Sequence, residues 1–450
     1  MIKRYLVALA ALFYVLGTGV QAQAQSLLRD AEIETLLWDY STPIFEAAGV
    51  PVDSIDIYLV GNNTPNAFVA GGLNMFIHTG LLTAADTPNQ IEGVIAHETG
   101  HMAGGHLARF GDGMRAATAP ILLTLGLGIL AAAAGAPEAG IAIIGQGQVA
   151  AQLEFLEYNR AQENAADQAA VTYLETAGLS GQGLVEFFAK LRNQQVIRAR
   201  RPQSYAQSHP LAGARVSAVQ GRIQESPFYE LKDDEAAVRR LQMAQAKIYG
   251  FLESPAQTFR RFPENDTPMA RYARSIAHFR ASDLTPALEG IDNLIAEEPD
   301  NPYFHELKGQ MLFEHGRTFE SIEPHRRSVE IAPNEPLLRI NLARAMIAAE
   351  RPDLVRPAID ELKVAVRFEP GNGFAWSELA RAYDALGETG LAELATAEAM
   401  YAAGDRRGAF TFAQRARQDL RRGTPEWRQA VDIMAATQPQ GRERERWSTE

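Results

Sequence analysis

The hydrophobic pattern begins with an apolar block near the start of the chain. Lys3 and Arg4 precede the apolar run from Tyr5 to Leu16, and small residues then lead to Ala22-Gln23-Ala24. A basic end, an apolar core and a small-residue cleavage site are typical of a secretory signal peptide, so we expect residues 1–24 to be removed. The core is too short for a comfortable membrane span. Export by this route predicts a bacterial periplasmic protein.

The second half of the chain carries apolar residues at helical spacing, interrupted by turns at regular distances. Intervals of 34 and 37 residues separate three prolines that end successive units: Pro299, Pro333 and Pro370. Paired helices with a 34-residue period are typical of tetratricopeptide repeats, and an insertion of three near residues 351–353 explains the longer interval. We therefore predict an α-solenoid of these repeats over residues 269–450, preceded by linking helices or a first repeat over 226–268. Such a stack binds ligands on its concave face.

In the first half, an apolar helical face runs from Ile91 to Ala96, and Asn89 can cap that helix. His97-Glu98-Thr99-Gly100-His101 follows directly. Because residues four apart share one helix face, His97 and His101 can bind one metal ion together, with Glu98 beside them as a general base toward water. The arrangement is the helix-borne zinc hydrolase motif. The alternative is a pair of surface histidines.

A catalytic zinc site normally has three protein ligands, so one more is needed. His106 follows Gly104 but comes one residue earlier than the extended zincin spacing requires. On a continuing helix, it would lie about half a turn away from His97. We interpret His106 as a residue at the helix end or behind the ligands.

A later segment, Leu153 to Ala177, reads as a second helix and carries four acids: Glu154, Glu157, Glu163 and Asp167. Glu163 and Asp167 lie four residues apart and share a face. One can bind the metal while the other accepts a hydrogen bond from a ligand imidazole. The residues alone do not choose Glu163 over the other acids, and a solvated acidic face is the alternative.

Residues 116–153 form a second apolar region, with no charged residue from Ala116 to Pro137. By length, this run can span a bilayer. A single crossing would separate His97 from Glu163 by about 30 Å of hydrocarbon, which one metal ion cannot bridge. We therefore predict an apolar helical hairpin near the active site that can contact a membrane surface, a partner or substrate, with buried core as the alternative.

Composition removes several function classes. The chain has 450 residues and a formal net charge of −12, which disfavours nucleic acid as a partner. It has no cysteine, so disulfides and a lipoprotein anchor are excluded. Gly145, Gly147 and Ala150 match a dinucleotide-binding pattern, but the surrounding series of strand–helix units is lacking. We do not expect a nucleotide site.

Several ordered motifs together resemble a zinc metallopeptidase family, that of the HtpX heat-shock protease and the CAAX prenyl protease. They are the two motifs at His97–His101 and Glu163–Asp167, the segment at 66–82, and Ser208-His209-Pro210 with Arg215. With the signal peptide and the repeats, the chain is similar to the periplasmic β-barrel assembly-enhancing proteases. The implied fold is mainly α (α+β): a zincin-like metallopeptidase domain with a small sheet at 25–225, then the α-solenoid.

The resemblance also implies residue roles. His97, His101 and Glu163 would bind one zinc ion per chain, and Glu98 would be the general base. Asp167 would lie beside the ligands, supporting them or donating a proton. His209 would either stabilise the tetrahedral intermediate or occupy the open zinc position and keep the enzyme inactive; a simple turn residue is the alternative.

The expected substrate contact is an edge strand within residues 66–78 that includes Asn66, Ala67 and Phe68. Such a strand pairs with an extended substrate through the main chain, which predicts weak sequence selectivity. By resemblance, the chain is a zinc metalloendopeptidase that degrades misfolded or stalled outer-membrane proteins. Its repeats would dock substrate or the outer-membrane β-barrel assembly machinery. The alternative functions are a repeat-containing chaperone or scaffold with a gated or inactive zinc site, and a membrane-embedded protease.

Overall fold

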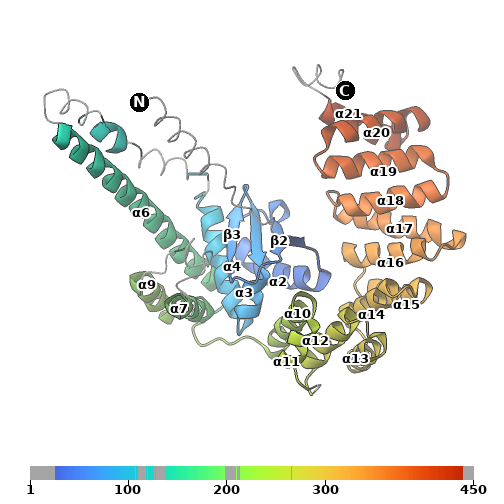
Figure 1. The fold of residues 1–450 in the computed structure, drawn as a ribbon, viewed down its shortest axis with the longest axis horizontal. Coiled ribbons are helices and arrows are strands. Elements are labelled where there is room, and N and C mark those ends of the chain that lie inside the picture. Colours follow the sequence, from blue (N-terminus) through green and yellow to red (C-terminus); the bar gives the residue numbers. More distant parts are fainter. Residues whose placement is uncertain are drawn as a thin grey trace, which may run out of the picture. The chain divides into compact units, whose positions relative to one another are not determined.

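The chain divides into two compact units (Figure 1). A computed structural model of the chain describes residues 26–106, 108–109, 118, 120–125, 127, 137–197, 209, 213–264 and 266–438. The first unit comprises Met1–Arg29 and Trp38–Asp233, and the second comprises Asp30–Leu37 and Asp234–Glu450. The division falls inside helix α2 (Ala31–Ala47). The expected signal peptide at 1–24 lies outside the described residues.

The first unit contains a four-stranded sheet in the order β1-β2-β4-β3. Its strands are β1 (Leu27–Leu28), β2 (Asp56–Val60), β3 (Ala67–Ala70) and β4 (Asn74–His78). β2 and β4 are parallel, while β1 and β3 pair antiparallel with their neighbours. Met75 and Ile77 of β4 are fully buried. Phe76, between them, points to the other face and stacks on Tyr58 and Phe68, each with ring centroids 5.0 Å apart. This alternation is the period of two that a half-buried strand requires.

The segment at 66–78 forms two strands, where the sequence predicted one edge strand. β4 is internal, between β2 and β3, so of these two strands β3 alone lies at an edge of the described sheet. The glycines at 71 and 72, which have φ of 60° and 101°, reverse the chain between the two strands.

Helix α4 (Pro88–Ala103) is the buried centre of the first unit. Every residue from Pro88 to Met102 is buried, because α6 (Pro137–Thr176) and α7 (Gln182–Ile197) pack on it and β3 lies alongside. The alternative of surface histidines on this helix is therefore wrong. The described part of this unit also contains η1 (Val52–Ser54), α3 (Thr79–Ala84) and α9 (Gly213–Gln224).

Asn89 does not cap α4, in contrast to the expectation. The helix begins one residue earlier, at Pro88, after Thr87. The Asn89 side chain instead donates to the Ser180 carbonyl oxygen at 2.6 Å and accepts from the Gly183 amide at 2.7 Å. It thereby fixes the turn that begins α7 against the start of α4.

Helix α6 is longer than the segment predicted from residue 153, because it begins at Pro137 and runs for 40 residues. Val149, Leu153 and Leu156 are exposed on it, as are Leu122 and Leu123 before it. Among the described helices, none is both long and apolar enough to cross a membrane. Much of the predicted hairpin at 116–153 lies outside the described residues.

The second unit consists of helices that pack in consecutive pairs (Figure 1). α10 (Glu235–Leu252) and α11 (Pro255–Arg261) come first. The pairs that follow are α12 (Pro268–Arg280) with α13 (Leu284–Glu297), α14 (Pro302–Glu314) with α15 (Thr318–Ile331), α16 (Pro336–Ala348) with α17 (Pro352–Phe368), α18 (Gly373–Ala385) with α19 (Thr389–Ala402), and α20 (Arg406–Asp419) with α21 (Pro425–Thr437).

The predicted phase of the repeats matches these helices. Pro299, Pro333 and Pro370 each follow the end of the second helix of a pair. α17 has 17 residues where α13 and α15 have 14, so the three inserted residues lengthen one helix. Fully buried alanines, including Ala343, Ala358 and Ala375, let neighbouring helices approach closely. The mainly α fold with a small sheet and an α-solenoid is confirmed.

A buried lysine joins Asp30–Leu37 to the helices of the second unit. Lys247 Nζ on α10 lies 2.8 Å from Asp30, 3.3 Å from Glu32 and 3.8 Å from Glu306. The hydroxyl of Tyr272 donates to Glu32 at 2.8 Å. Burial lowers the pKa of Lys247, but the surrounding acids outweigh it and hold that pKa well above its usual value. The lysine is therefore charged, and it neutralises part of this acidic cluster.

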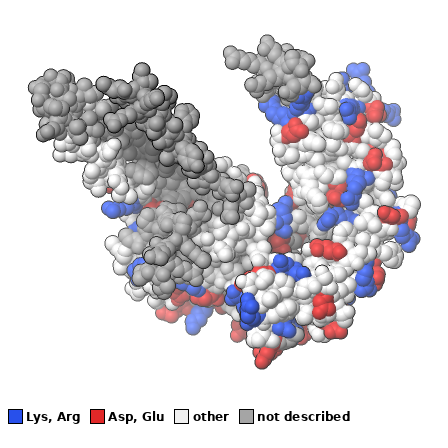
Figure 2. Space-filling view, in the orientation of Figure 1, with Lys and Arg blue, Asp and Glu red and all other residues white. Residues whose placement is uncertain are grey.

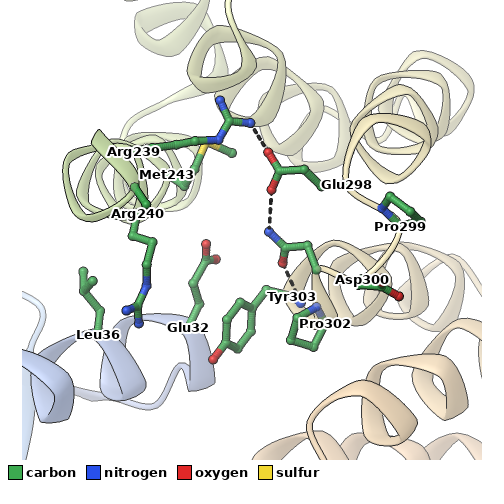
Figure 3. A pocket seen from close by; sticks show the side chains of 12 residues that line it. Glu32, Leu36, Arg239, Arg240, Met243, Glu298, Pro299, Asp300, Pro302 and Tyr303 are labelled. Carbon is green, nitrogen blue, oxygen red and sulfur yellow. Dashed lines mark hydrogen bonds and ion pairs between the residues drawn. The ribbon is translucent and has the colours of Figure 1, made fainter. Parts of the chain in front are cut away.

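A cavity of about 570 Å³ opens beside this cluster, entirely within the second unit (Figure 3). Leu36, Met243 and Tyr303 contribute its apolar wall. At its edge, Arg239 forms an ion pair with Glu298, which also accepts a hydrogen bond from Asn301 at 3.3 Å. Elsewhere on the face shown in Figure 2, basic and acidic side chains are interspersed over the repeat helices. A mixed surface of this kind does not favour a polyanion.

Candidate metal centre

Helix α4 supplies two imidazoles that face the same point. His97 is fully buried and His101 nearly so, and their Nε2 atoms are 3.1 Å apart. The two rings are at an interplanar angle of 71°. Their spacing of four residues on one helix produces this convergence, as the sequence predicted.

Helix α6 brings Glu163 to this pair. Its Oε1 lies 3.3 Å from His101 Nε2, and its Oε2 lies 3.6 Å from His97 Nε2. A close approach of α4 and α6 makes these distances attainable. A Cβ atom on Gly100 would lie 2.8 Å from the backbone oxygen of Ala166, so only glycine fits there without movement.

His209 completes the cluster. Its Nδ1 lies 3.0 Å from Glu163 Oε1 and 3.3 Å from His97 Nε2. One ligand atom from each of His97, His101, Glu163 and His209 lies within 4.8 Å of the other three. The neighbouring residues Ser208 and Pro210 lie outside the described residues.

The cluster has the donor set and spacing of a zinc site. Tetrahedral zinc with bonds of 2.0–2.1 Å requires ligand atoms about 3.3–3.4 Å apart. The five separations given above range from 3.0 to 3.6 Å. Imidazole nitrogens and a carboxylate are also ligands that zinc prefers. The residues therefore fit a bound zinc ion.

Asp167, one turn after Glu163 on α6, lies behind the ligands. Its Oδ1 is 3.0 Å from His97 Nδ1, the ring nitrogen opposite the cluster. This places a carboxylate where it can fix the tautomer and direction of the His97 ring. Burial lowers the pKa of His97, but its interactions with Asp167 and Glu163 outweigh burial and raise that pKa to about 9.

Arg215 on α9 connects Asp167 to Glu163. Its Nε and Nη2 donate to the two carboxylate oxygens of Asp167 at 2.7 and 2.8 Å, and its Nη1 lies 2.8 Å from Glu163 Oε2. Burial raises the pKa of Asp167, but His97 and Arg215 outweigh it and lower that pKa. The pKa of Glu163 is likewise well below its usual range: burial opposes this, and hydrogen bonds from the histidines outweigh it. Both carboxylates are therefore ionised.

Glu98 is buried beside the cluster without joining it. Its Oε1 has no hydrogen-bond partner among the described residues and lies 3.4 Å from His209 Nε2. A buried carboxylate with an oxygen that accepts no hydrogen bond, next to a candidate metal centre, is placed to accept a proton.

The proposed substrate residues lie at the start of β3, the strand at one edge of the described sheet. Ala67 and Phe68 begin β3, whose outer edge has no partner strand in the described sheet. The carbonyl oxygen of Asn66 accepts a hydrogen bond from the His78 amide at 3.0 Å, so the main chain of Asn66 faces inward at that atom. β3 also contacts α4, which carries His97 and His101.

Sequence reasoning gave no geometric role to Arg215, which entered only as part of a motif. A guanidinium that contacts two carboxylates from another helix leaves no periodic signal. The dinucleotide-like pattern at 145–150 lies inside helix α6 and follows no strand of the described sheet, so it lacks the strand-to-helix turn of a dinucleotide-binding motif.

Comparisons with known proteins agree with this geometry. Residues 28–223 match the profile of Peptidase family M48. The chain is 24% identical to a "Beta-barrel assembly-enhancing protease" of Yersinia pestis over 329 residues, covering 72% of this chain and 67% of that protein. It is also 24% identical to the protein of that name from Escherichia coli strain K12 over 351 residues, covering 77% and 71%.

Among solved structures, a "thermophilic TPR protein" of Thermus thermophilus is 17% identical, with a TM-score of 0.29, and the match covers 41% of this chain and 92% of that one. The repeat fold of this chain is established by its own helix pairs. The family match covers the sheet, α4, Glu163 on α6, and α9. Residues 28–223, which carry the candidate metal centre, therefore form a metallopeptidase domain that matches Peptidase family M48.

Proposed function

We propose that the protein is a zinc-dependent endopeptidase of the bacterial periplasm that degrades misfolded or stalled outer-membrane proteins. The observation that carries the hydrolytic part is the cluster of His97, His101 and Glu163 beside the buried carboxylate of Glu98. The compartment is supported by the signal-like pattern at residues 1–24. The substrate class is supported by the names of the two assembly-enhancing relatives.

When bound, zinc supplies Lewis acidity, which lowers the pKa of water and polarises a carbonyl group. Glu98 accepts the proton of the attacking water at its uncommitted Oε1 and later donates it to the leaving amine. Asp167 and Arg215 keep His97 and Glu163 in place during this exchange. The edge of β3 binds substrate as an added strand, which reads the backbone more than the side chains.

His209 holds the resting site closed in this proposal. Its Nδ1 takes the fourth place around the cluster, while its Nε2 faces the carboxylate of Glu98. One imidazole thus occupies the place that water needs and sits against the base that would activate it. His209→Ala should therefore raise the rate of casein hydrolysis. A loss of hydrolysis in this variant would instead assign His209 to stabilising the intermediate.

The direct test combines metal content with hydrolysis. We expect one zinc per chain, with anomalous scattering at the zinc edge placing the ion between His97, His101 and Glu163. Glu98→Gln should retain zinc and lower casein cleavage by about 10²–10⁴-fold, the usual contribution of a general base. Full activity in Glu98→Gln would remove the assigned base, and the absence of zinc would remove the site.

The repeats dock the substrate or an assembly partner. The cavity beside Leu36, Met243 and Tyr303 offers an apolar wall with a charged edge, which suits an apolar side chain of an unfolded polypeptide. Ala236 also lines this cavity, so Ala236→Trp should fill it and weaken binding of an unfolded outer-membrane protein while leaving cleavage of a short peptide unchanged. Ala403→Trp, at an exposed helix end elsewhere in the repeats, is the matched control.

Membrane contact and a chaperone role are two further proposals, each with its own experiment. The exposed apolar residues Val149, Leu153 and Leu156 suit contact with a membrane surface, which vesicle flotation of wild type against a Leu153→Glu variant tests. A chaperone or scaffold with an inactive site is the second candidate function. It is favoured by the closed position of His209, and it would be supported if His209→Ala prevented aggregation of unfolded protein without cleaving it.

A further inference from the structure

His106 lies directly behind the ligand His101. It is nearly buried, and its Nδ1 is 2.9 Å from His101 Nδ1. The Nδ1 of His101 is the ring nitrogen opposite Nε2, which faces the cluster. His106 is therefore on the far side of His101 and is not one of the converging ligand atoms.

The chain builds a specific turn to put the ring there. α4 ends at Ala103, and Gly105 adopts φ of 62°, which favours glycine. The His106 amide then donates back to the His101 carbonyl oxygen at 3.1 Å. A Cβ atom on Gly104 would lie 2.6 Å from His106 Nε2, so the ring occupies the space that the missing side chain leaves. The two glycines thus place this imidazole against one chosen atom.

We propose that His106 is a positioning residue that fixes the tautomer and direction of His101, an inference that rests on the proposed metal site. To bind a metal through Nε2, His101 must carry its proton on Nδ1. That N–H donates to His106 Nδ1, which accepts when the His106 proton is on its own Nε2. Because His101 Nε2 would be bound to the metal, its only proton is on Nδ1, and this direction of the hydrogen bond is the one compatible with a bound ion; a flipped His101 ring would lose the bond.

The two helix ligands are then held from behind by different partners. His97 has the Asp167 carboxylate at 3.0 Å, and His101 has a neutral imidazole at 2.9 Å. A carboxylate partner also increases the basicity of the ligand, whereas a neutral acceptor mainly orients it. His106 therefore contributes direction more than charge. We expect its loss to weaken metal binding toward the lower end of the 10–100-fold range known for such partners.

The experiment compares His106→Leu with His106→Asn in the full chain. Asparagine keeps an acceptor oxygen close to the place of Nδ1, while leucine keeps bulk and loses the acceptor. Zinc affinity is measured by competition with a chromophoric chelator, and the visible spectrum of the Co²⁺-loaded protein reports the ligand field. We expect about a tenfold loss of zinc affinity and an altered Co²⁺ spectrum for leucine, with both restored to near wild type by asparagine.

The outcomes separate this inference from the proposed function. If wild type fails to bind zinc, the proposed function fails first. The inference is overturned if wild type binds zinc and both variants bind it as tightly as wild type. It is also overturned if the zinc affinity falls equally in both variants, because His106 then does not act through its acceptor. Thermal unfolding in EDTA checks folding. If leucine unfolds the chain, Gly104→Ala, which displaces the ring by its new Cβ, must produce the same loss of affinity.

Discussion

Each unit has a cluster of carboxylates, and the two clusters differ in the position of the basic side chain that neutralises them. In the second unit, the ammonium of Lys247 lies among Asp30, Glu32 and Glu306. In the first unit, Arg215 contacts Asp167 and Glu163 from one side, while the imidazoles of the cluster turn their nitrogens toward a common point. The first cluster is thus arranged for an added cation, and the second carries its own.

This difference shows how a buried acidic cluster can be judged. Buried carboxylates persist when they are paired or bind a metal. Where a lysine occupies the centre, the cluster stabilises the fold and leaves no place for an ion. Where histidine nitrogens and carboxylate oxygens lie about 3.3 Å from one another, which is the spacing of ligand atoms around tetrahedral zinc, the cluster favours a bound metal ion. Four substitutions break or sharpen the contrast.

The largest effect is expected from Lys247→Met, which removes the internal cation and leaves the buried Glu32 and Glu306 and the half-buried Asp30 together without it. Breaking a buried pair by removing one partner typically costs about 3–5 kcal/mol. Urea unfolding followed by circular dichroism measures the change. Lys308→Met removes a more exposed lysine, paired with Asp292 at 2.6 Å, and should cost at most about 1 kcal/mol. Equal losses in the two variants would contradict the importance of the buried cluster.

Gly100→Ala should separate α4 from α6 and thereby pull Glu163 away from the histidines. The added Cβ meets backbone atoms of Ala166, which cannot rotate away. We expect zinc affinity to fall at least about 100-fold, equivalent to about 2.7 kcal/mol. Gly145→Ala is the control, because nothing lies within 4 Å of its added Cβ on α6. Unchanged zinc binding in Gly100→Ala would mean that the helix contact does not set the site.

Arg215→Met should weaken zinc binding by about 10–100-fold, the range found when a group that orients metal ligands is removed. Loss of the guanidinium leaves Asp167 and Glu163 mutually repelling and free to turn. Arg222→Met on the same helix is the matched control, since Arg222 is bonded to Gln168 and Thr172 at the surface. Isothermal titration with zinc should show no effect for that control.

The smallest effect concerns pH. Burial raises the pKa of Glu306; Lys247 opposes this, but Asp30 and Glu32 add to it, and the pKa reaches about 7. The unfolded value is near 4.5. Between these pH values, the folded chain holds a proton that the unfolded chain has lost, so this group makes stability fall as pH rises from about 4.5 to 7. Below that window, its contribution is fully present.

Glu306→Gln should therefore reduce the decline in melting temperature between about pH 5 and pH 7.5, measured by calorimetry. Glu92→Gln is a useful comparison, because burial also raises the pKa of Glu92 to about 7, in the first unit. If the wild-type and Glu306→Gln profiles ran parallel, the protonation assigned to Glu306 in the folded chain would be wrong.

The sequence predicted the features that repeat or that lie on one helix face. His97 with His101, and Glu163 with Asp167, are pairs at a spacing of four, which places each pair on one side of its helix. The prolines at 299, 333 and 370 each follow a helix end, because proline is disfavoured in the interior of a helix. The solenoid followed from such local patterns, whereas the small sheet was implied by the family resemblance.

Features that depend on distant partners were not predictable in this way. Asn89 reads as a helix cap, yet its amide binds a turn far along the chain. His106 falls outside the zincin spacing, and only the conformation of Gly105 turns it back toward His101. Arg215 and Lys247 each satisfy carboxylates from other elements, and a single buried charge has no periodicity to detect.

The inclusion of residues 30–37 in the second unit has a consequence for the order in which the chain can fold. These residues are synthesised early, but Lys247 and Tyr272, which contact Asp30 and Glu32, come more than two hundred residues later. Residues 30–37 therefore cannot pack against the first helices of the solenoid until the whole peptidase domain has been synthesised. Forming that contact also closes a loop of more than two hundred residues, which costs conformational entropy. In a nascent or truncated chain that ends within the peptidase domain, Ala31 and Leu36 would lack their apolar partners and would be exposed to quality-control proteases.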